Sequence, residues 1–446
     1  MTVRSSGTWL FVAALAALAL LLLGAAPVRA ERGMEVAISD EDAMVTGKAG
    51  DTALAYRTAQ ALNATRMRIL VEWARVSDAD SATPSDNPDY NWGPIDRAID
   101  AAAAYGMRTQ LALAGPAPAY ASGNGRVSIP VVNPDPARFA DFARAAAQHF
   151  RGRVDRYSIW NEPNYPAWLQ PQSQSPQLYR ALYEAGYGAI KSVDPSAHVL
   201  IGETVPYGGK VIIKTKVKGK RGQKAKTVSK GKKMGLATAP LKWLRAVACV
   251  NKRYKRIGGC MPLQSDGYAQ HPYDLEFGGA ATLPTSKEFP GPDNAPIQTL
   301  GRLRKALDKL ARAKALTTPS GQALDIYLTE SGYFVSGKRK MAPAKRAKFL
   351  PLQFQVAAKE PRVREMLQYN VFVPPVGFTT GLFTLDGQAL PEYRTLLAWT
   401  QRAAAGRLIK PNTGPIPLPP APPDPNAPPT TTGCIRIGFN CLPPPR

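Results

Sequence analysis

The chain has 446 residues, and its 57 lysine and arginine residues exceed its 33 aspartate and glutamate residues, which makes the formal net charge +24. A hydrophobic content of 44% excludes a wholly disordered chain, and the presence of only one long apolar run excludes a polytopic membrane protein. Three histidines and four cysteines argue against a histidine-rich metal enzyme or a disulfide-stapled mini-domain.

Residues 1–30 have the features of a secretory signal peptide. Arg4 precedes the apolar segment 9–24, and the small residues Val28 and Ala30 fit a cleavage site after Ala30. The alternative is an uncleaved membrane anchor, because this apolar segment approaches the length of a membrane span. In both cases the rest of the chain is exported, so we expect a secreted, extracellular protein.

Residues 31–408 alternate between short apolar, β-branched segments and alanine-rich segments with helical spacing, which predicts an α/β domain. The strands are expected at 34–38, 66–72, 107–113, 154–160, 198–202, 265–270, 324–329 and 366–373. The helices are expected at 51–63, 94–105, 135–150, 176–193, 240–250, 295–315, 344–358 and 391–404. Eight strands that are each followed by a helix predict a (β/α)8 TIM barrel. A doubly wound open sheet is less suitable, because no glycine-rich phosphate loop follows the first strand.

Residues 209–235, which follow the fifth strand, form a basic insertion with eleven lysine and arginine residues and no acidic residue. Polybasic segments attract polyanions by counterion release, and for an exported protein we expect an anionic cell-wall polymer, an anionic lipid surface or an acidic polysaccharide. The alternative is a solvated loop that only keeps the protein soluble. Few aromatic residues are interleaved with the basic ones and no recognition motif is present, so we expect no nucleic-acid partner.

Export also permits disulfides. Four cysteines allow three pairings, and proximity in sequence favours Cys249 with Cys260 and Cys434 with Cys441. The second pair lies in the tail formed by residues 409–446, which has thirteen prolines between Pro411 and the C-terminus. Proline removes backbone donors and favours extended conformations, so this tail is predicted to be a spacer without a core of its own.

In a TIM barrel the chemistry takes place at the carboxyl ends of the strands, and two of the predicted strands end in a glutamate. Glu162 follows the fourth strand and Glu330 follows the seventh. These strands lie across the barrel mouth from each other, so the two carboxylates can converge on one bond. Glycoside hydrolysis needs such a pair, because one carboxyl protonates the leaving oxygen while the other attacks the anomeric carbon or activates water.

The sequence Asn161-Glu162-Pro163, together with Glu330, resembles the clan A glycoside hydrolases, most closely the cellulase-type family five and the xylosidase-like family thirty-nine. Other segments are similar to these families as well: Arg68 to Trp73 in strand two, Tyr90 to Asp96 before strand three, His271-Pro272-Tyr273 after strand six, and Asp386 to Tyr393 before the last helix. The resemblance spans residues 34–404.

This resemblance implies roles for several residues. Glu162 would be the acid/base and Glu330 the nucleophile. Asn161 would bind the 2-hydroxyl of the sugar, and Tyr273 and Arg68 would hold Glu330 ionised, because hydrogen bonds and opposite charges favour a carboxylate.

Further residues near the predicted strand ends are suited to substrate binding. The resemblance implies that His271 contacts sugar hydroxyls. Trp168, in a polar loop after strand four, is the best candidate for stacking on a sugar ring. Glu203 after strand five is a third strand-end carboxylate, with either a structural role or a hydrogen bond to substrate. The eighth strand lacks the tryptophan that is usual in these families, and Tyr369 or Phe372 is expected in its place.

We therefore expect a secreted retaining glycoside hydrolase that cleaves β-glycosidic bonds of a poly- or oligosaccharide. It would be a monomer and would need neither a metal nor an organic cofactor. The alternative is a non-catalytic, glycan- or polyanion-binding cell-wall protein on a barrel scaffold, in which the basic insertion is the functional part.

Overall fold

The computed structural model describes residues 33–77, 90–217, 226–233, 235–274, 283–286, 289–422, 435–437 and 440–442. The predicted signal peptide, residues 1–30, and Cys434 of the predicted second disulfide lie outside the described residues. Among the residues that are described, no helix is long and apolar enough to cross a membrane.

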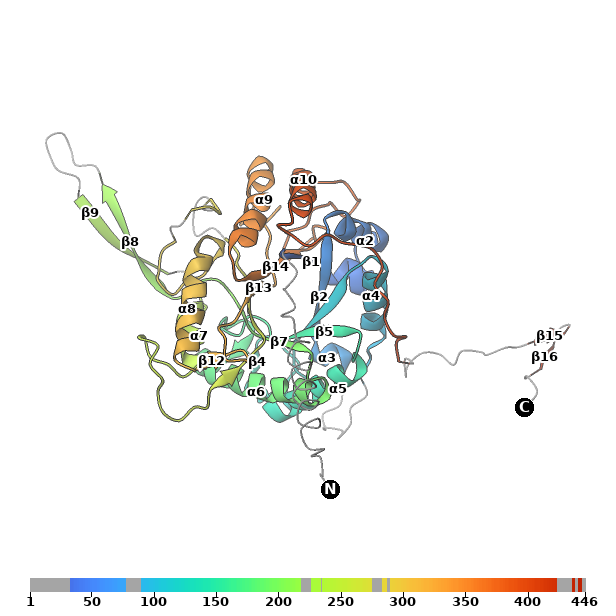
Figure 1. Cartoon of the computed structure of the whole chain (residues 1–446), viewed down its shortest axis with the longest axis horizontal. Coiled ribbons are helices and arrows are strands. Elements are labelled where there is room, and N and C mark those ends of the chain that lie inside the picture. The colour runs from blue at the N-terminus through green and yellow to red at the C-terminus, as the bar shows by residue number, and fades with distance from the viewer. Residues whose placement is uncertain are drawn as a thin grey trace, which may run out of the picture.

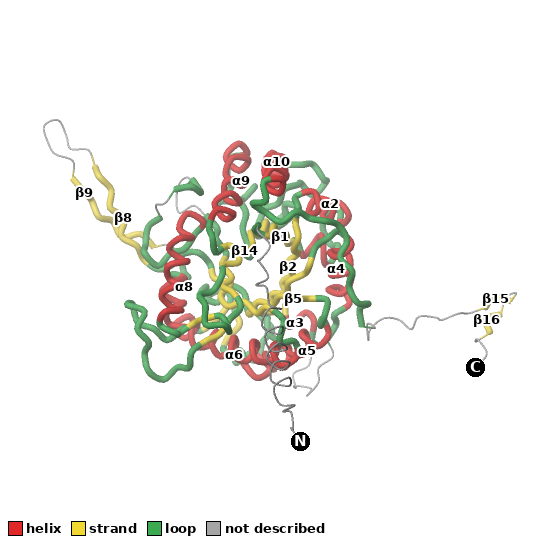
Figure 2. Tube along the Cα trace, in the orientation of Figure 1, coloured by secondary structure: helices red, strands yellow, loops and turns green. Residues whose placement is uncertain are grey.

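Eight parallel strands form a closed barrel in the order β1-β14-β13-β11-β7-β5-β3-β2, with the helices in a ring around it (Figures 1 and 2). The strands are β1 (Glu35–Ser39), β2 (Ala64–Glu72), β3 (Arg108–Ala114), β5 (Val154–Ile159), β7 (His198–Thr204), β11 (Gly267–Gln270), β13 (Ile326–Leu328) and β14 (Val363–Tyr369). Each overlaps one of the eight strands expected from the sequence, and the predicted (β/α)8 architecture is confirmed.

A helix follows every barrel strand. The main helices are α2 (Thr52–Ala61), α4 (Gly93–Ala104), α5 (Pro136–His149), α6 (Ser175–Val193), α7 (Pro240–Val247), α8 (Leu300–Arg312), α9 (Pro343–Lys359) and α10 (Pro391–Ala405). Shorter helical segments are η1 (Glu41–Val45), α3 (Trp73–Val76), η2 (Ala119–Ala121), η3 (Gln172–Gln174) and η4 (Ile297–Thr299). Asp51 and Asp135 accept hydrogen bonds from backbone N–H groups in the first turns of α2 and α5, which stabilises these helix starts.

Small two-stranded sheets lie outside the barrel. They pair β4 (Val131–Val132) with β6 (Leu169–Gln170), β10 (Leu263–Gln264) with β12 (Leu316–Thr317), β8 (Lys210–Val217) with β9 (Lys226–Lys233), and β15 (Ile435–Ile437) with β16 (Asn440–Leu442). Within the basic insertion, residues 210–217 and 226–233 therefore form an antiparallel pair, which we call the β8–β9 hairpin and which projects away from the barrel on the side of α8 (Figure 1). Residues 218–225 and 234 lie outside the described residues. Cys249 and Cys260 form the predicted disulfide.

The last barrel strand ends earlier than expected. The sequence predicts a strand over 366–373, but β14 ends at Tyr369 and Asn370 has a left-handed backbone with φ 64°. The carboxylate of Asp40 then accepts hydrogen bonds from the N–H groups of Val371 (2.9 Å) and Phe372 (3.0 Å). The apolar run continues into the core, but its backbone leaves the parallel ladder because a side chain satisfies its donors.

The beginning of the predicted tail packs on the barrel. The N–H of Met34 donates to the carbonyl of Leu408, and the N–H of Lys410 donates to the carbonyl of Met34. Ile409 is fully buried, and the N–H of Ile416 donates to Ala103 at the end of α4. The first residues after 408 therefore close the end of the barrel opposite the predicted site.

A buried ion-pair network fills the interior of that same end. Arg156 on β5 contacts Glu35 on β1 at 2.8 Å and Glu365 on β14 at 2.6 Å. Gln110 on β3 donates to Glu365 at 3.0 Å, and Arg66 on β2 contacts Glu35 at 3.3 Å. The network links five of the barrel strands, and its charges are paired as burial requires.

Candidate active site

The chain turns sharply at the carboxyl ends of several barrel strands. Trp160, Glu162 and Glu203 all have left-handed backbones, with φ of 69°, 43° and 52°. Such angles are uncommon for residues other than glycine, and they concentrate at functional sites. The N–H of Glu162 donates to the carbonyl of Glu203 at 2.9 Å, so the turns after β5 and β7 hold each other in place.

These turns bring Glu162 and Glu330 into one buried group. An oxygen of Glu162, an oxygen of Glu330 and a ring nitrogen of His271 all lie within 4.8 Å of one another. The exposed fractions of the two glutamates are 6% and 7%. Side chains 168 positions apart in sequence therefore meet at the barrel mouth, where the barrel fold predicted that they would converge.

His271 lies between the carboxylates. Its Nδ1 is 3.0 Å from Oε1 of Glu162 and 3.6 Å from Oε2 of Glu330, and its Nε2 is 2.7 Å from Oε2 of Glu203. Burial lowers the pKa of His271, but the charge of Glu330 and the hydrogen bonds to Glu162 and Glu203 outweigh burial and raise this pKa to about 10. The ring is thus an imidazolium at neutral pH, and both of its nitrogens are donors.

The resemblance implied that His271 contacts sugar hydroxyls, and this stays a prediction. The side chain is fully buried, and both ring nitrogens face carboxylates, because three acidic residues surround the ring.

Glu203 stabilises the charge on His271. Its carboxylate is fully buried and accepts hydrogen bonds from Nε2 of His271 and from Oγ1 of Thr329 at 2.8 Å, and it lies 3.4 Å from the guanidinium of Arg68. Burial raises the pKa of Glu203, but Arg68, His271 and Ser158 outweigh burial and lower this pKa to about 2. Of the two roles predicted for Glu203, the structure shows the contacts that a structural role requires.

Glu330 has the donors that the sequence predicted. The hydroxyl of Tyr273 donates to Oε1 at 2.8 Å, and the guanidinium of Arg68 lies 3.7 Å from Oε2. Burial nevertheless raises the pKa of Glu330 above its ordinary value and the charge of Glu162 adds to this, although His271, Arg68 and Tyr273 lower it. The donors lower the pKa of Glu330, as expected, but they do not outweigh burial together with the charge of Glu162. Two carboxylates this close to each other resist being ionised together.

Arg68 and Trp168 complete the contacts of the site. Arg68 donates to Oδ1 of Asn161 at 3.0 Å, which fixes the orientation of that amide next to Glu162. Trp168 was predicted to be a stacking platform, but its indole N–H donates to Oε2 of Glu162 at 3.0 Å. Its ring is only partly buried, so the hydrogen bond does not prevent contact with a sugar.

The eighth strand was expected to supply Tyr369 or Phe372 in place of the usual tryptophan. Phe372 is buried in the core, with its ring 6.2 Å from that of Phe383, so it does not form the floor of the site. Tyr369 lies near Phe378, at 6.0 Å between ring centroids, and Phe378 lies 5.5 Å from Tyr273. Sequence reasoning missed Phe378, because this residue follows the strand in an irregular loop and reaches the site only through the path of that loop.

The group formed by Glu162, His271 and Glu330 also has the atom types and spacing of a metal site. A metal would need a lone pair on Nδ1 of His271. The carboxylates around this ring favour its protonated form, which has no lone pair to offer. A metal at this position would have to displace the proton from Nδ1.

Comparison with protein-family models and with curated proteins found no match. Solved structures do match. A family 39 glycoside hydrolase from the gut symbiont Bacteroides cellulosilyticus WH2 is 17% identical with a TM-score of 0.56, and the alignment covers 83% of this chain and 64% of that protein. A glucosidase from Croceicoccus marinus (12% identical, 84% and 68% covered) has a TM-score of 0.53. A GH39 enzyme from Xanthomonas axonopodis pv. citri (18% identical, 84% and 67% covered) has a TM-score of 0.50.

At these identities the likeness establishes the fold. The chain spans less than two thirds of the length of the Bacteroides protein. The barrel is of the kind found in family 39 enzymes, in agreement with the resemblance noted in the sequence.

Proposed function

We propose that the protein is a retaining glycoside hydrolase that acts on β-glycosidic bonds of a poly- or oligosaccharide. The observation that carries this proposal is the approach of Glu162 and Glu330 to within 4.8 Å. Retaining enzymes separate their carboxyl groups by about 5–5.5 Å, whereas inverting enzymes leave about 6.5–9.5 Å for a water molecule. Two carboxylate oxygens this close to each other support the retaining arrangement, in which one carboxylate attacks directly. The glycosidases that share the fold support the same assignment.

The reaction follows from these positions in two steps. Glu330 attacks the anomeric carbon while Glu162 gives its proton to the leaving oxygen, so that the glycosidic bond breaks and a glycosyl ester forms on Glu330. Glu162, now ionised, takes a proton from water, and the resulting hydroxide attacks the anomeric carbon and frees Glu330. The second step restores the proton on Glu162.

The surrounding charges support this division of labour. Glu162, Glu203 and Glu330 carry three negative charges when ionised, and Arg68 and His271 carry two positive ones. We propose that Glu162 supplies the proton in the substrate complex, as the first step of the reaction requires. The contacts of Tyr273 and Arg68 favour the ionised form of Glu330.

Azide rescue tests the two roles separately. In Glu330→Gly, azide can replace the nucleophile, and an aryl β-glycoside should yield an α-glycosyl azide. In Glu162→Ala, azide should attack the glycosyl ester and yield a β-glycosyl azide. Each variant should lose at least about 100-fold in turnover without azide. Glu184→Gln, at an exposed position on α6, is the matched control. Wild-type turnover in both active-site variants would refute the proposed roles of Glu162 and Glu330, and absence of turnover in the wild-type protein would favour the non-catalytic alternative.

We also propose that the protein is exported and monomeric. The signal-like residues 1–30 support export, and so does the Cys249–Cys260 disulfide, which is typical of oxidising compartments. Mass spectrometry of the protein recovered from culture medium should find a mature N-terminus at Glu31, and light scattering should give the mass of one chain. Retention of the whole chain in membranes would instead identify residues 1–30 as an anchor.

A second proposal concerns the β8–β9 hairpin as a polyanion-binding arm, for example for a cell-wall polymer. Its projection beyond the barrel (Figure 1) and the eleven basic residues of 209–235 support this proposal. Replacing 210–233 by a short glycine-serine linker should abolish salt-sensitive retention on dextran sulfate and leave aryl-glycoside turnover intact. Unchanged retention would identify the hairpin as a merely solvated insertion.

A further inference from the structure

The loops that follow β13 and β14 enclose a second cavity near the glutamate pair. This cavity has a volume of 530 Å³ and is lined by residues 334, 336–339 and 375–379; we call it the loop pocket. Its volume lies within the range of small-ligand sites, about 300–1,000 Å³. The first of its loops begins only four residues after Glu330.

Aromatic rings connect the loop pocket with the catalytic residues. Phe334 and Phe378 form its walls, with ring centroids 5.4 Å apart. Phe378 also lies 5.5 Å from Tyr273, whose hydroxyl donates to Glu330. Two aromatic residues, Phe378 and Tyr273, therefore connect the pocket with the proposed nucleophile.

The two loops are fastened to each other, so the loop pocket is preformed. The N–H of Val335 donates to the carbonyl of Thr379 at 2.7 Å. The N–H of Ser336 donates to Oγ1 of Thr379 at 3.2 Å. The amide of Asn370 donates to the carbonyl of Phe378 at 2.6 Å. A pocket whose walls are already ordered loses little entropy when a ligand enters.

The charge of the loop pocket is one-sided. Lys338 and Arg339 line it, and no acidic residue is among its described lining residues. The sequence contains no aspartate or glutamate from Ser331 to Lys359, nor from Val371 to Leu385. The guanidinium of Arg339 lies 5.7 Å from the ring centroid of Phe334, a contact that positions the cation without neutralising it.

Arg339 also acts on the electrostatics of the site itself. Burial raises the pKa of Tyr207, the charge of Arg339 opposes this, and the charges of Asp274 and Glu162 add to it. Arg339 and Glu162 thus influence the same phenol.

We propose that the loop pocket binds the anionic group of an acidic sugar unit, a carboxylate or a sulfate ester, in the glycan that the enzyme cleaves. Lys338 and Arg339 would bind the anion, and the partly exposed ring of Phe378 would contact the apolar face of the sugar. This inference rests on the proposed glycosidase function and adds a substrate class to it.

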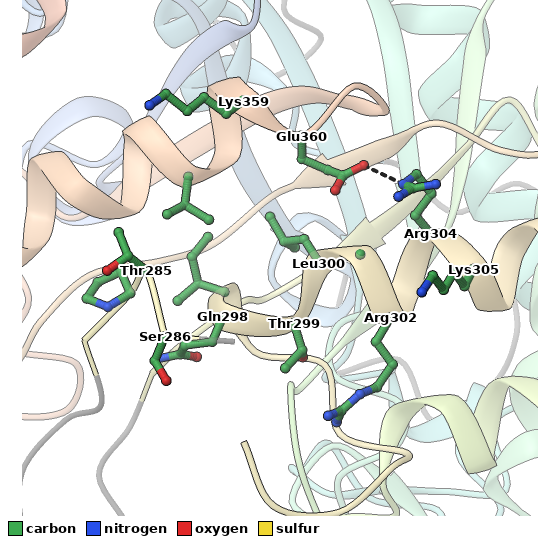
Figure 3. A pocket seen from close by; sticks show the side chains of 14 residues that line it. Thr285, Ser286, Gln298, Thr299, Leu300, Arg302, Arg304, Lys305, Lys359 and Glu360 are labelled. Atoms are coloured by element: carbon green, nitrogen blue, oxygen red, sulfur yellow. Dashed lines mark ion pairs between the residues drawn. The ribbon is translucent and has the colours of Figure 1, made fainter. Parts of the chain in front are cut away.

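A different cavity provides the matched control. It measures 590 Å³ and lies between the start of α8 and the end of α9 (Figure 3). Lys305 and Lys359 line it, and it contains an acidic residue, Glu360, which is paired with Arg304 at 2.7 Å. The variant Lys305→Ala/Lys359→Ala removes the same number of cations from the chain, but away from the glutamate pair.

The test compares glucuronoxylan oligosaccharides with the same oligosaccharides after reduction of the carboxyl groups, and sulfated with unsulfated xylo-oligosaccharides. Binding to the Glu330→Gln chain is measured by calorimetry at low salt. In at least one pair the acidic form should bind about 5- to 30-fold more tightly, a factor expected for two exposed ion pairs. Lys338→Ala/Arg339→Ala should remove most of this preference, and the control variant should keep it.

The outcomes distinguish a failure of the acidic-substrate proposal from a failure of the proposed glycosidase function. Equal binding of acidic and neutral forms by the wild-type pocket, or an unchanged preference in Lys338→Ala/Arg339→Ala, would overturn the acidic-substrate inference even if aryl glycosides are cleaved. Absence of aryl-glycoside turnover with a preference that depends on Lys338 and Arg339 would refute the glycosidase and leave the anionic site intact. The carboxylated and sulfated pairs show which anion is preferred.

Discussion

Replacing Glu203 by glutamine should lower the pKa of His271, so that its ring loses the positive charge at a lower pH. The pKa of His271 rises from an ordinary value of 6.5 to about 10 in the folded protein, and Glu203 supplies the 2.7 Å contact to Nε2. Loss of one adjacent opposite charge lowers such a pKa by roughly 1–3 units. The pKa of His271 in Glu203→Gln is therefore expected between about 7 and 9, and part of the rings would be neutral at pH 8.

The sign of the effect on stability follows from linkage. A histidine with a raised pKa in the folded state adds stability that is fully present below pH 6.5 and is lost as the pH rises toward 10. For the shift of His271 this stability is on the order of 5 kcal/mol. In Glu203→Gln the loss should begin at the same pH, be complete at a lower pH, between about 7 and 9, and be smaller in total.

Two measurements check this prediction. With only three histidines in the chain, the ring of His271 can be assigned by NMR, and it should show no titration from pH 5 to 8 in the wild type. Urea unfolding from pH 6 to 10 gives the stability profile, with the exposed Glu184→Gln as control. Titration of wild-type His271 near 6.5, or an identical titration in Glu203→Gln, would refute the charged-histidine account.

Three further predictions concern single contacts. Trp168→Phe keeps the ring but removes the N–H that donates to Glu162, so kcat should fall about tenfold with little change in KM; an unchanged kcat would restore the stacking role as the main one. Arg156→Ala removes the cation paired with Glu365 and one of the cations paired with Glu35, and should lower the free energy of unfolding by about 3–5 kcal/mol in urea; a loss below 1 kcal/mol would contradict a paired network. Reduction of Cys249–Cys260, which closes a short loop, should cost about 2–3 kcal/mol, measured as a lower Tm in the presence of a reductant.

The basic hairpin and the tail illustrate what composition can and cannot predict. The run of lysines in 209–235 indicated an exposed segment, because so many like charges cannot be buried. Its strand pairing was missed, because lysine is unfavourable in strands; β8 and β9 pair from Lys210 with Lys233 to Val217 with Lys226.

Residues 409–416 were assigned to a spacer because of their prolines, but Ile409 fills a gap at the end of the barrel that is visible only in three dimensions.

By itself, the sequence determined the eight strands, their helices and the two glutamates at the strand ends. These are local signals: the alternation of apolar segments, capping aspartates such as Asp135, and a carboxylate directly after a strand. Only the tertiary structure decided which charged side chains of the site contact one another. The position of His271 among three carboxylates, the pKa of Glu330 and the nearness of Phe378 depend on residues from different strands and loops, because electrostatic energy and burial are set by distances in space and not by spacing along the chain.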